Sequence, residues 1–176
     1  MNVFLDFEAS SLAKDSFPVE VAWVFEDDRS RSSLLRPAPA WSDWSSEAEH
    51  LHGLSRERLE TEGEPVERVA RDMVEALSGH QLYASAPSWD GKWLSVLLRT
   101  GGQPRHALRL GKSDDAFMAA ARDILGSASD DAIAALVAGV IARTTPPAPA
   151  HRALPDAVLE LERFKQVRAA ALAQAN

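Results

Sequence analysis

The apolar positions near the start of the chain predict a three-stranded antiparallel meander. Residues 3–7 form a short, nearly continuous apolar run, as expected of a strand that is covered on both faces in the middle of a sheet. Residues 19–25 are rich in β-branched and aromatic side chains, and residues 29–36 can pair back after the acidic turn at 26–28. Residues 37–49 contain many Pro, Ser and acidic residues, which is typical of a loop.

The remainder of the chain alternates helical and strand patterns. From Pro65 to Leu77 apolar side chains recur at helical spacing, and residues 81–85 can then form a strand parallel to the first through a helical crossover. Further elements are predicted as helices over 89–99, 114–125, 130–142 and 154–173, a short strand over 105–110 and a Pro-rich break over 144–150. We therefore expect an α/β fold with a mixed five-stranded sheet, an antiparallel meander followed by parallel strands, flanked by helices.

Composition narrows the class of protein. The 176 residues suggest a single domain spanning 1–176, and the 45% hydrophobic content is enough for a sizeable core. No apolar run is long enough to span a bilayer, and Asp6 and Glu8 lie where a signal peptide would be apolar, so we expect no membrane association and a cytoplasmic location. Because the chain has no cysteine, a metal must be bound by oxygen or imidazole. The net charge of −7 argues against bulk coating of nucleic acid but not against an enzyme that acts on it.

Two carboxylates on the first predicted strand are the first candidates for chemistry. Asp6 and Glu8 are two residues apart, so their side chains leave the same face of the strand and can share an ion. Burying two acids on a central strand is unfavourable unless a positive charge lies between them. The alternative is that both lie at a frayed strand end and face water.

Two further segments carry candidate acids and a histidine. Pro155 fits only the first turn of the last helix, so Asp156 projects from that turn and His151 lies in the loop before it. Asp90 follows a predicted strand at the start of a helix. Taken one at a time, both acids are explained as helix N-terminal residues and His151 as an ordinary loop histidine. Together with Asp6 and Glu8, the set is harder to explain that way.

Together these segments resemble the DnaQ-like (DEDDh) branch of the DEDD exonuclease superfamily, whose last motif contains a histidine. The acids of Asp6-Phe7-Glu8 match the first motif, Asp90 with Trp93-Leu94 matches the second, and His151 with Asp156 matches the third. Leu51-His52-Gly53-Leu54-Ser55 is similar to the HGI/HGL segment of the family. In two places the chain departs from the common pattern, with Ala9-Ser10-Ser11 in place of Thr-Thr-Gly and Ser85-Ala86-Pro87-Ser88-Trp89-Asp90 in place of H-N-x-x-F-D.

The resemblance implies an RNase H-like fold and a metal-dependent 3′–5′ exonuclease that releases nucleoside monophosphates from single-stranded DNA or RNA. It implies two divalent cations, Mg²⁺ or Mn²⁺, held by Asp6, Glu8, Asp90 and Asp156, ligands of the type that hard ions prefer. In this assignment Asp6 bridges the ions, Glu8 and Asp156 hold the ion that carries the nucleophilic water, and Asp90 supports the site. His151 is the implied general base.

The same resemblance places the last nucleotide of the substrate near the first strand and the HGL segment. The residues expected to contact it or shape its pocket are Ala9, Ser10, Leu12, His52, Leu54, Trp89 and Trp93. For Leu12 and Leu54 plain core packing is the alternative. The basic residues Arg105, His106, Arg109 and Lys112 either follow the phosphate backbone or form a solvated strand face, and Trp41 and Trp44 either stack on bases or pack in the core or a dimer contact.

Several alternatives stay open at this point. A catalytically weak or inactive module that binds nucleic acid or protein could use the same fold, although it would have no need of four carboxylates and a histidine in this arrangement. Within the enzyme class, an oligoribonuclease or tRNA-trimming role competes with DNA proofreading or repair. A homodimer is an expectation drawn from similar ribonucleases.

Overall fold

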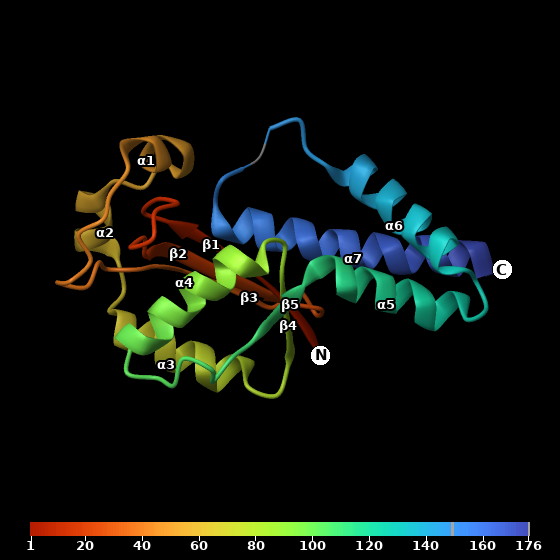
Figure 1. Ribbon diagram of the computed structural model, residues 1–176, viewed down its shortest axis with the longest axis horizontal. Helices are drawn as coiled ribbons and strands as arrows, with labels where there is room; N and C mark the ends of the chain where they lie inside the picture. Colours follow the sequence, from red (N-terminus) through yellow and green to blue (C-terminus); the bar gives the residue numbers. More distant parts are fainter. Residues whose placement is uncertain (149, 176) are drawn as a thin grey trace.

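A five-stranded mixed sheet forms the centre of the computed structural model, which describes residues 1–148 and 150–175 (Figure 1). Its strands are β1 (Asn2–Ala9), β2 (Pro18–Phe25), β3 (Ser30–Leu34), β4 (Gln81–Ala84) and β5 (Leu110–Lys112), in the order β3-β2-β1-β4-β5. β1, β2 and β3 pair antiparallel, whereas β4 pairs parallel with both β1 and β5. The predicted meander followed by parallel strands is therefore confirmed, and β1 is a central strand.

Helices cover both faces of this sheet. They are α1 (Ser46–His52), α2 (Arg56–Glu62), α3 (Val66–Leu77), α4 (Pro87–Thr100), α5 (Ser113–Leu125), α6 (Asp130–Thr144) and α7 (Ala153–Ala175). α3 and α4 pack on one face, and the long helix α7 packs on the other, with α5 and α6 beside it (Figure 1). In the described residues, no helix combines the length and the apolar character needed to cross a membrane.

The side chains of β1 divide the hydrophobic core into two clusters. Val3, Leu5 and Phe7 point to the face covered by α3 and α4. Phe4 points to the opposite face, where its ring packs on Phe117 of α5, Phe164 of α7 and other apolar side chains. Since side chains alternate along a strand, Asp6 and Glu8 follow Phe4 on the α7 face.

Two short helices were not predicted: α1 begins inside the region predicted as loop, 37–49, and α2 lies after it, where no element was predicted. Ser45 precedes α1 and its hydroxyl accepts a hydrogen bond from the Ala48 N–H, while Gly53 ends the helix with a left-handed backbone (φ 69°). Ser55 caps α2 in the same way by accepting from the Arg58 N–H. Each helix has only seven residues, too few for a clear helical period.

The prediction for the fifth strand was wrong in its boundaries. The residues around Arg105 and Arg109 form exposed turns, and the strand begins only at Leu110. Gly111 pairs with Tyr83, where a Cβ atom would lie 3.1 Å from the tyrosine ring, so a larger residue there would require the ring to shift. Smaller shifts occur at α4, which begins with Pro87 in its first turn, two residues before the predicted start, and at α7, which begins at Ala153. The predicted Pro-rich break includes residue 149, which lies outside the described residues.

Candidate metal centre and active site

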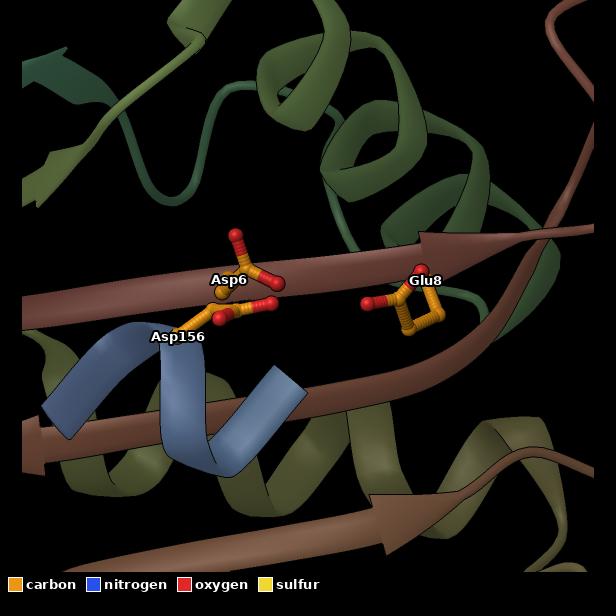
Figure 2. Close-up of side chains that lie close together, drawn as sticks. All are labelled: Asp6, Glu8 and Asp156. Atoms are coloured by element: carbon orange, nitrogen blue, oxygen red, sulfur yellow. The ribbon is translucent and has the colours of Figure 1, made fainter. Parts of the chain in front are cut away.

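Three carboxylates that are far apart in the sequence converge at one point. Asp6, Glu8 and Asp156 each offer an oxygen within 4.8 Å of the others. Figure 2 shows Asp6 and Glu8 leaving β1 on one side and Asp156 reaching them from the first turn of α7. The chain thus brings together three of the four acids that the motifs predicted.

The two strand acids are in an environment that opposes their ionisation. Burial, with repulsion from Asp90, Glu8 and other acids, raises the pKa of Asp6 well above its ordinary value. Burial, with repulsion from Asp156 and Glu20, raises the pKa of Glu8 to about 7. The pKa of Asp156 is raised as well, mainly by burial. A cluster of this kind carries unfavourable repulsion when it is ionised in the absence of a cation.

Asp90, the fourth predicted acid, lies beside this triad rather than within it. It is 3% exposed in the first turn of α4, and its Oδ2 accepts a hydrogen bond of 3.2 Å from the Ala86 N–H. Burial raises the pKa of Asp90 to about 7, although backbone N–H groups, including that of Phe7, oppose the shift. The charge of Asp90 in turn raises the pKa of Asp6, so the two acids are electrostatic neighbours.

The donor set fits hard divalent cations. All of the converging atoms are carboxylate oxygens, which Mg²⁺ and Mn²⁺ prefer, and the sequence has no cysteine whose thiolate would favour a softer ion. The carboxylates whose mutual repulsion helps to raise these pKa values would each attract a bound cation. The residues placed to hold such ions are Asp6, Glu8 and Asp156, with Asp90 near enough to support them.

His151 lies in the loop before α7, at the rim of the same site. Its backbone is left-handed (φ 50°), a conformation that is uncommon for a residue with a side chain. Such a conformation persists where neighbouring contacts hold it. Burial raises the pKa of Asp156, and contacts with His151, including its backbone N–H, oppose part of that rise, so the two residues are neighbours.

A cavity of about 290 Å³ opens beside the acids. Six of the residues predicted for the active site line it, namely Glu8, Ala9, Leu12, His52, Trp93 and His151. Leu12 is 70% exposed at its edge, so the alternative of core packing does not apply to this leucine. The cavity is a concave site in direct contact with a candidate metal ligand and a candidate base.

The other residues predicted for substrate contact do not line this cavity. Ser10 is buried, and its hydroxyl donates to Asp43 (2.7 Å). Leu54 is fully buried in the core, which confirms the alternative prediction of core packing for this residue. Trp89 is 38% exposed on α4 and stacks on Trp93, with ring centroids 5.7 Å apart.

The fold has close counterparts among solved structures. A zinc-bound form of the Escherichia coli exonuclease I complex with single-stranded DNA matches with a TM-score of 0.69 over 96% of this chain at 14% identity, and the chain covers 40% of that protein. The chain shares the fold of one part of exonuclease I. Escherichia coli exonuclease I with a dA16 oligonucleotide (TM-score 0.67, 13% identity, 95% of this chain and 41% of that chain) and exonuclease I from Methylocaldum szegediense (0.65, 16%, 95% and 40%) agree.

These matches confirm the predicted RNase H-like fold and the resemblance to DnaQ-like exonucleases at the level of the fold. The chain spans about two fifths of the length of the exonuclease I structures. No protein-family model and no curated protein matches the sequence.

Two buried acids near the carboxylate cluster belong to none of the predicted motifs. Glu20 on β2 is 1% exposed, and Glu160 on α7 is 5% exposed and raises the pKa of both Asp6 and Asp90. Each had a signal in the sequence: Glu20 interrupts an apolar strand, and Glu160 lies one helical turn after Asp156. Glu160 is paired with Arg163 (2.6 Å) on its own helix.

The aromatic and basic candidates outside the motifs have mainly structural surroundings. Trp41 is buried and stacks on Phe17, and the Trp44 indole N–H donates to Glu49 (2.7 Å), so both pack in or against the core. Arg105 and His106 are exposed and hydrogen-bonded to each other (2.7 Å), and Lys112 pairs with Asp114 (2.6 Å). The predicted basic cluster is therefore a solvated surface on the β4–β5 side of the molecule.

Proposed function

We propose that this chain is a metal-dependent 3′–5′ exonuclease that releases nucleoside monophosphates from the end of single-stranded DNA. The observation that carries the proposal is the convergence of Asp6, Glu8 and Asp156 within 4.8 Å, beside a cavity that includes His151. The fold shared with exonuclease I bound to single-stranded DNA supports the choice of substrate.

The acids would bind the divalent cations that supply the positive charge needed for phosphodiester hydrolysis. Divalent cations held by these acids would activate a water and stabilise charge on the phosphoryl and leaving oxygens. Asp6, Glu8 and Asp156 supply the inner oxygens, and Asp90 supports them from the start of α4. We assign Mg²⁺ or Mn²⁺ because the donor set consists of carboxylates.

His151 acts as the general base in this proposal. A neutral imidazole can accept a proton near pH 7, and the residue lines the cavity together with Glu8. Its half-buried position in the loop before α7 supports this role, because a loop residue can approach a bound substrate. After proton transfer, the nearby carboxylate of Asp156 stabilises the imidazolium.

The cavity receives the last nucleotide of the strand. Ala9 and Leu12 at the end of β1 form one side, and His52 from the HGL segment forms another. Burial lowers the pKa of His52, and its Nδ1 accepts the Leu54 N–H (3.1 Å), so the ring is neutral and its Nε2 carries the hydrogen. Trp93 closes the cavity on the α4 side.

The direct test is digestion of end-labelled oligonucleotides. A single-stranded DNA labelled at its 5′ end should shorten progressively, and the same DNA labelled at its 3′ end should release a labelled mononucleotide at once. Chelation should stop both reactions, and Mg²⁺ or Mn²⁺ should restore them. RNA of the same sequence, digested in parallel, decides between the DNA and RNA classes.

A matched variant distinguishes hydrolysis by this chain from hydrolysis by a contaminating nuclease. His151→Ala should bind Mn²⁺ with nearly unchanged affinity and lower turnover by about 10²- to 10⁴-fold, the usual contribution of a general base. Release from the 5′ end, or hydrolysis that survives chelation, contradicts the proposal. Tight binding of DNA without hydrolysis would instead support the binding-module alternative. The homodimer expected from the sequence stays a prediction.

A further inference from the structure

A partly buried ion pair that no motif includes lies next to the proposed metal ligands. Glu20 of β2 and Arg152, the residue after His151, join through two hydrogen bonds, Nη2 to Oε1 at 2.7 Å and Nε to Oε2 at 2.9 Å. The Glu20 side chain is 2% exposed and that of Arg152 is 38% exposed. A bidentate pair of this kind fixes the plane of the guanidinium.

Glu20 also lies directly beside Glu8. The two residues are opposite each other in the antiparallel register of β1 and β2, so their side chains leave the same face of the sheet. Like charges in this position repel each other, and Glu20 is among the groups that oppose ionisation of Glu8. An acid at position 20 therefore needs a cationic partner, and Arg152 provides it.

The remaining hydrogen-bonding capacity of Glu20 ties it to the start of α7 and to β3. Its Oε2 accepts the N–H of Ala153, the first residue of α7, at 3.0 Å. Its Oε1 accepts the Ser32 hydroxyl at 3.3 Å. Both carboxylate oxygens are thus occupied, and Glu20 is not free to act as a metal ligand itself.

Arg152 has a second acid within its electrostatic range, which is Glu8. Because a guanidinium is permanently charged and binds carboxylates in a bidentate manner, an Arg152 released from Glu20 would pair with Glu8. A Glu8 carboxylate engaged in this way competes poorly as a ligand for a divalent cation. In the structure Arg152 therefore pairs with Glu20 on β2, the strand next to the one that carries Glu8.

We propose that Glu20 is a positioning residue that keeps the Arg152 guanidinium off Glu8 and so leaves the Glu8 carboxylate free for a divalent cation. This inference rests on the proposed function, because it assumes that Glu8 binds a metal. It adds a residue from β2 and the residue between His151 and α7 to the set that determines metal affinity.

Calorimetric titration of metal-free protein with Mn²⁺ tests the proposal without any measurement of activity. Glu20→Gln keeps an acceptor for the Ala153 N–H but releases the guanidinium, and it should weaken Mn²⁺ binding by about 10- to 100-fold, the usual range for partners of metal ligands. Glu20→Asp keeps the charge with a shorter reach and should weaken binding less. The double variant Glu20→Gln/Arg152→Met has no guanidinium to compete and should recover most of the lost affinity.

The double variant separates competition from simple loosening of the fold. If Glu20 served only to anchor the start of α7, the double variant would bind Mn²⁺ at least as weakly as Glu20→Gln. Glu64→Gln is the matched control: it removes the same single charge from another partly buried ion pair, with Arg31 at 3.1 Å on β3, and should leave Mn²⁺ affinity unchanged. Circular dichroism of each variant verifies folding.

The outcomes distinguish the two proposals. Wild-type affinity in Glu20→Gln, or no recovery in the double variant, overturns the role of Glu20 and leaves the proposed function standing. Wild-type protein that does not bind Mn²⁺ overturns both. Weaker binding in Glu20→Gln with recovery in the double variant supports the inference, whichever nucleic acid proves to be the substrate.

Discussion

The two faces of β1 obey different physical requirements. On the face towards α3 and α4, Val3, Leu5 and Phe7 are all apolar and buried, as hydrophobic burial alone would dictate. On the face towards α7, the strand is apolar only at Phe4 and becomes acidic at Asp6 and Glu8. Both faces belong to a strand at the centre of the same sheet.

The acidic half of the α7 face has no explanation in folding. Its acids repel one another, and burial raises their pKa values, so in the absence of a cation this part of the strand lowers the stability of the chain. Stored repulsion that is maintained by side chains from β1 and α7 together is typical of a functional site. One face of β1 therefore specifies the fold, and the end of the other face specifies the chemistry.

The largest expected effect comes from neutralising the acid at the centre of that site. Asp6→Asn should abolish Mn²⁺ binding and lower turnover by at least about 10³-fold, because the variant loses the charge that attracts the cation. The same substitution should raise the melting temperature of the metal-free protein, since it removes repulsion with Glu8 and Asp90. Calorimetry, turnover and thermal unfolding in chelator measure the three quantities. A metal-free variant that is less stable than the wild type would contradict the separation of roles.

A substitution on the other face should have the opposite profile. Leu5 is fully buried against the α3 and α4 side, and Leu5→Ala should lower the free energy of unfolding by about 2–5 kcal/mol. Turnover per folded molecule, measured well below the melting temperature, should stay near that of the wild type. Large loss of turnover in a folded Leu5→Ala protein would show that the two faces of β1 are mechanically coupled.

The same contrast explains which parts of the structure the sequence could predict. The apolar patterns of β1, β2 and α3 are repeated over several residues, so their type and order were predicted correctly. Asp6, Glu8 and Asp156 were predicted from motifs, and the structure brings them together, although their catalytic roles stay predictions. The order of the motifs along the chain was sufficient for this because each is attached to a well-predicted element.

The errors have a common cause. Tertiary contacts, rather than local sequence patterns, determine where short helices and strands form and which partner an isolated charged residue has. α1, α2 and β5 are too short to show a period of their own, and β5 is defined by its pairing with β4, where Gly111 lies opposite Tyr83. The pairing of Glu20 with Arg152 joins residues 132 positions apart, and no local pattern connects them. A charged residue within an apolar strand was the only signal of Glu20 in the sequence.

A third prediction concerns the dependence of stability on pH. Glu8 and Asp90 titrate near 7 in the folded chain but near their ordinary values of 4.5 and 3.8 when unfolded, so the folded state binds more protons between these limits. The stability of the metal-free protein should therefore fall as the pH rises from about 4 to about 7 and should change little from these groups above that range. Mn²⁺ should stabilise the protein more at about pH 8 than at about pH 5, because protons compete for the same oxygens.

Thermal unfolding in chelator and in Mn²⁺ across this pH range measures the effect, which we expect to amount to several degrees. Asp6→Asn serves as the control, because removing one acid of the cluster should flatten the dependence of the metal-free protein. Equal stabilisation by Mn²⁺ at both ends of the range would mean that the acidic end of β1 does not bind the ion.

The smallest expected effect is that of replacing Trp89, which tests how far the functional region extends from β1 onto α4. Trp89 is partly exposed, its ring stacks on Trp93 at the wall of the cavity, and the Lys92 ammonium lies 5.2 Å from the Trp89 ring centre. An aromatic surface beside a cation is suited to stacking on a nucleobase, a contact worth about 1–3 kcal/mol. Trp89→Ala should therefore raise KM for single-stranded DNA by about 5- to 100-fold with little change in kcat, whereas Trp89→Phe should keep most of the affinity. Because Trp89 is itself partly exposed and outside the core cluster, the melting temperature of the variant should fall only slightly. A fall in kcat at constant KM would instead indicate that Trp89 helps to position the neighbouring Asp90. The start of α4 would then contribute to the chemical step rather than to binding.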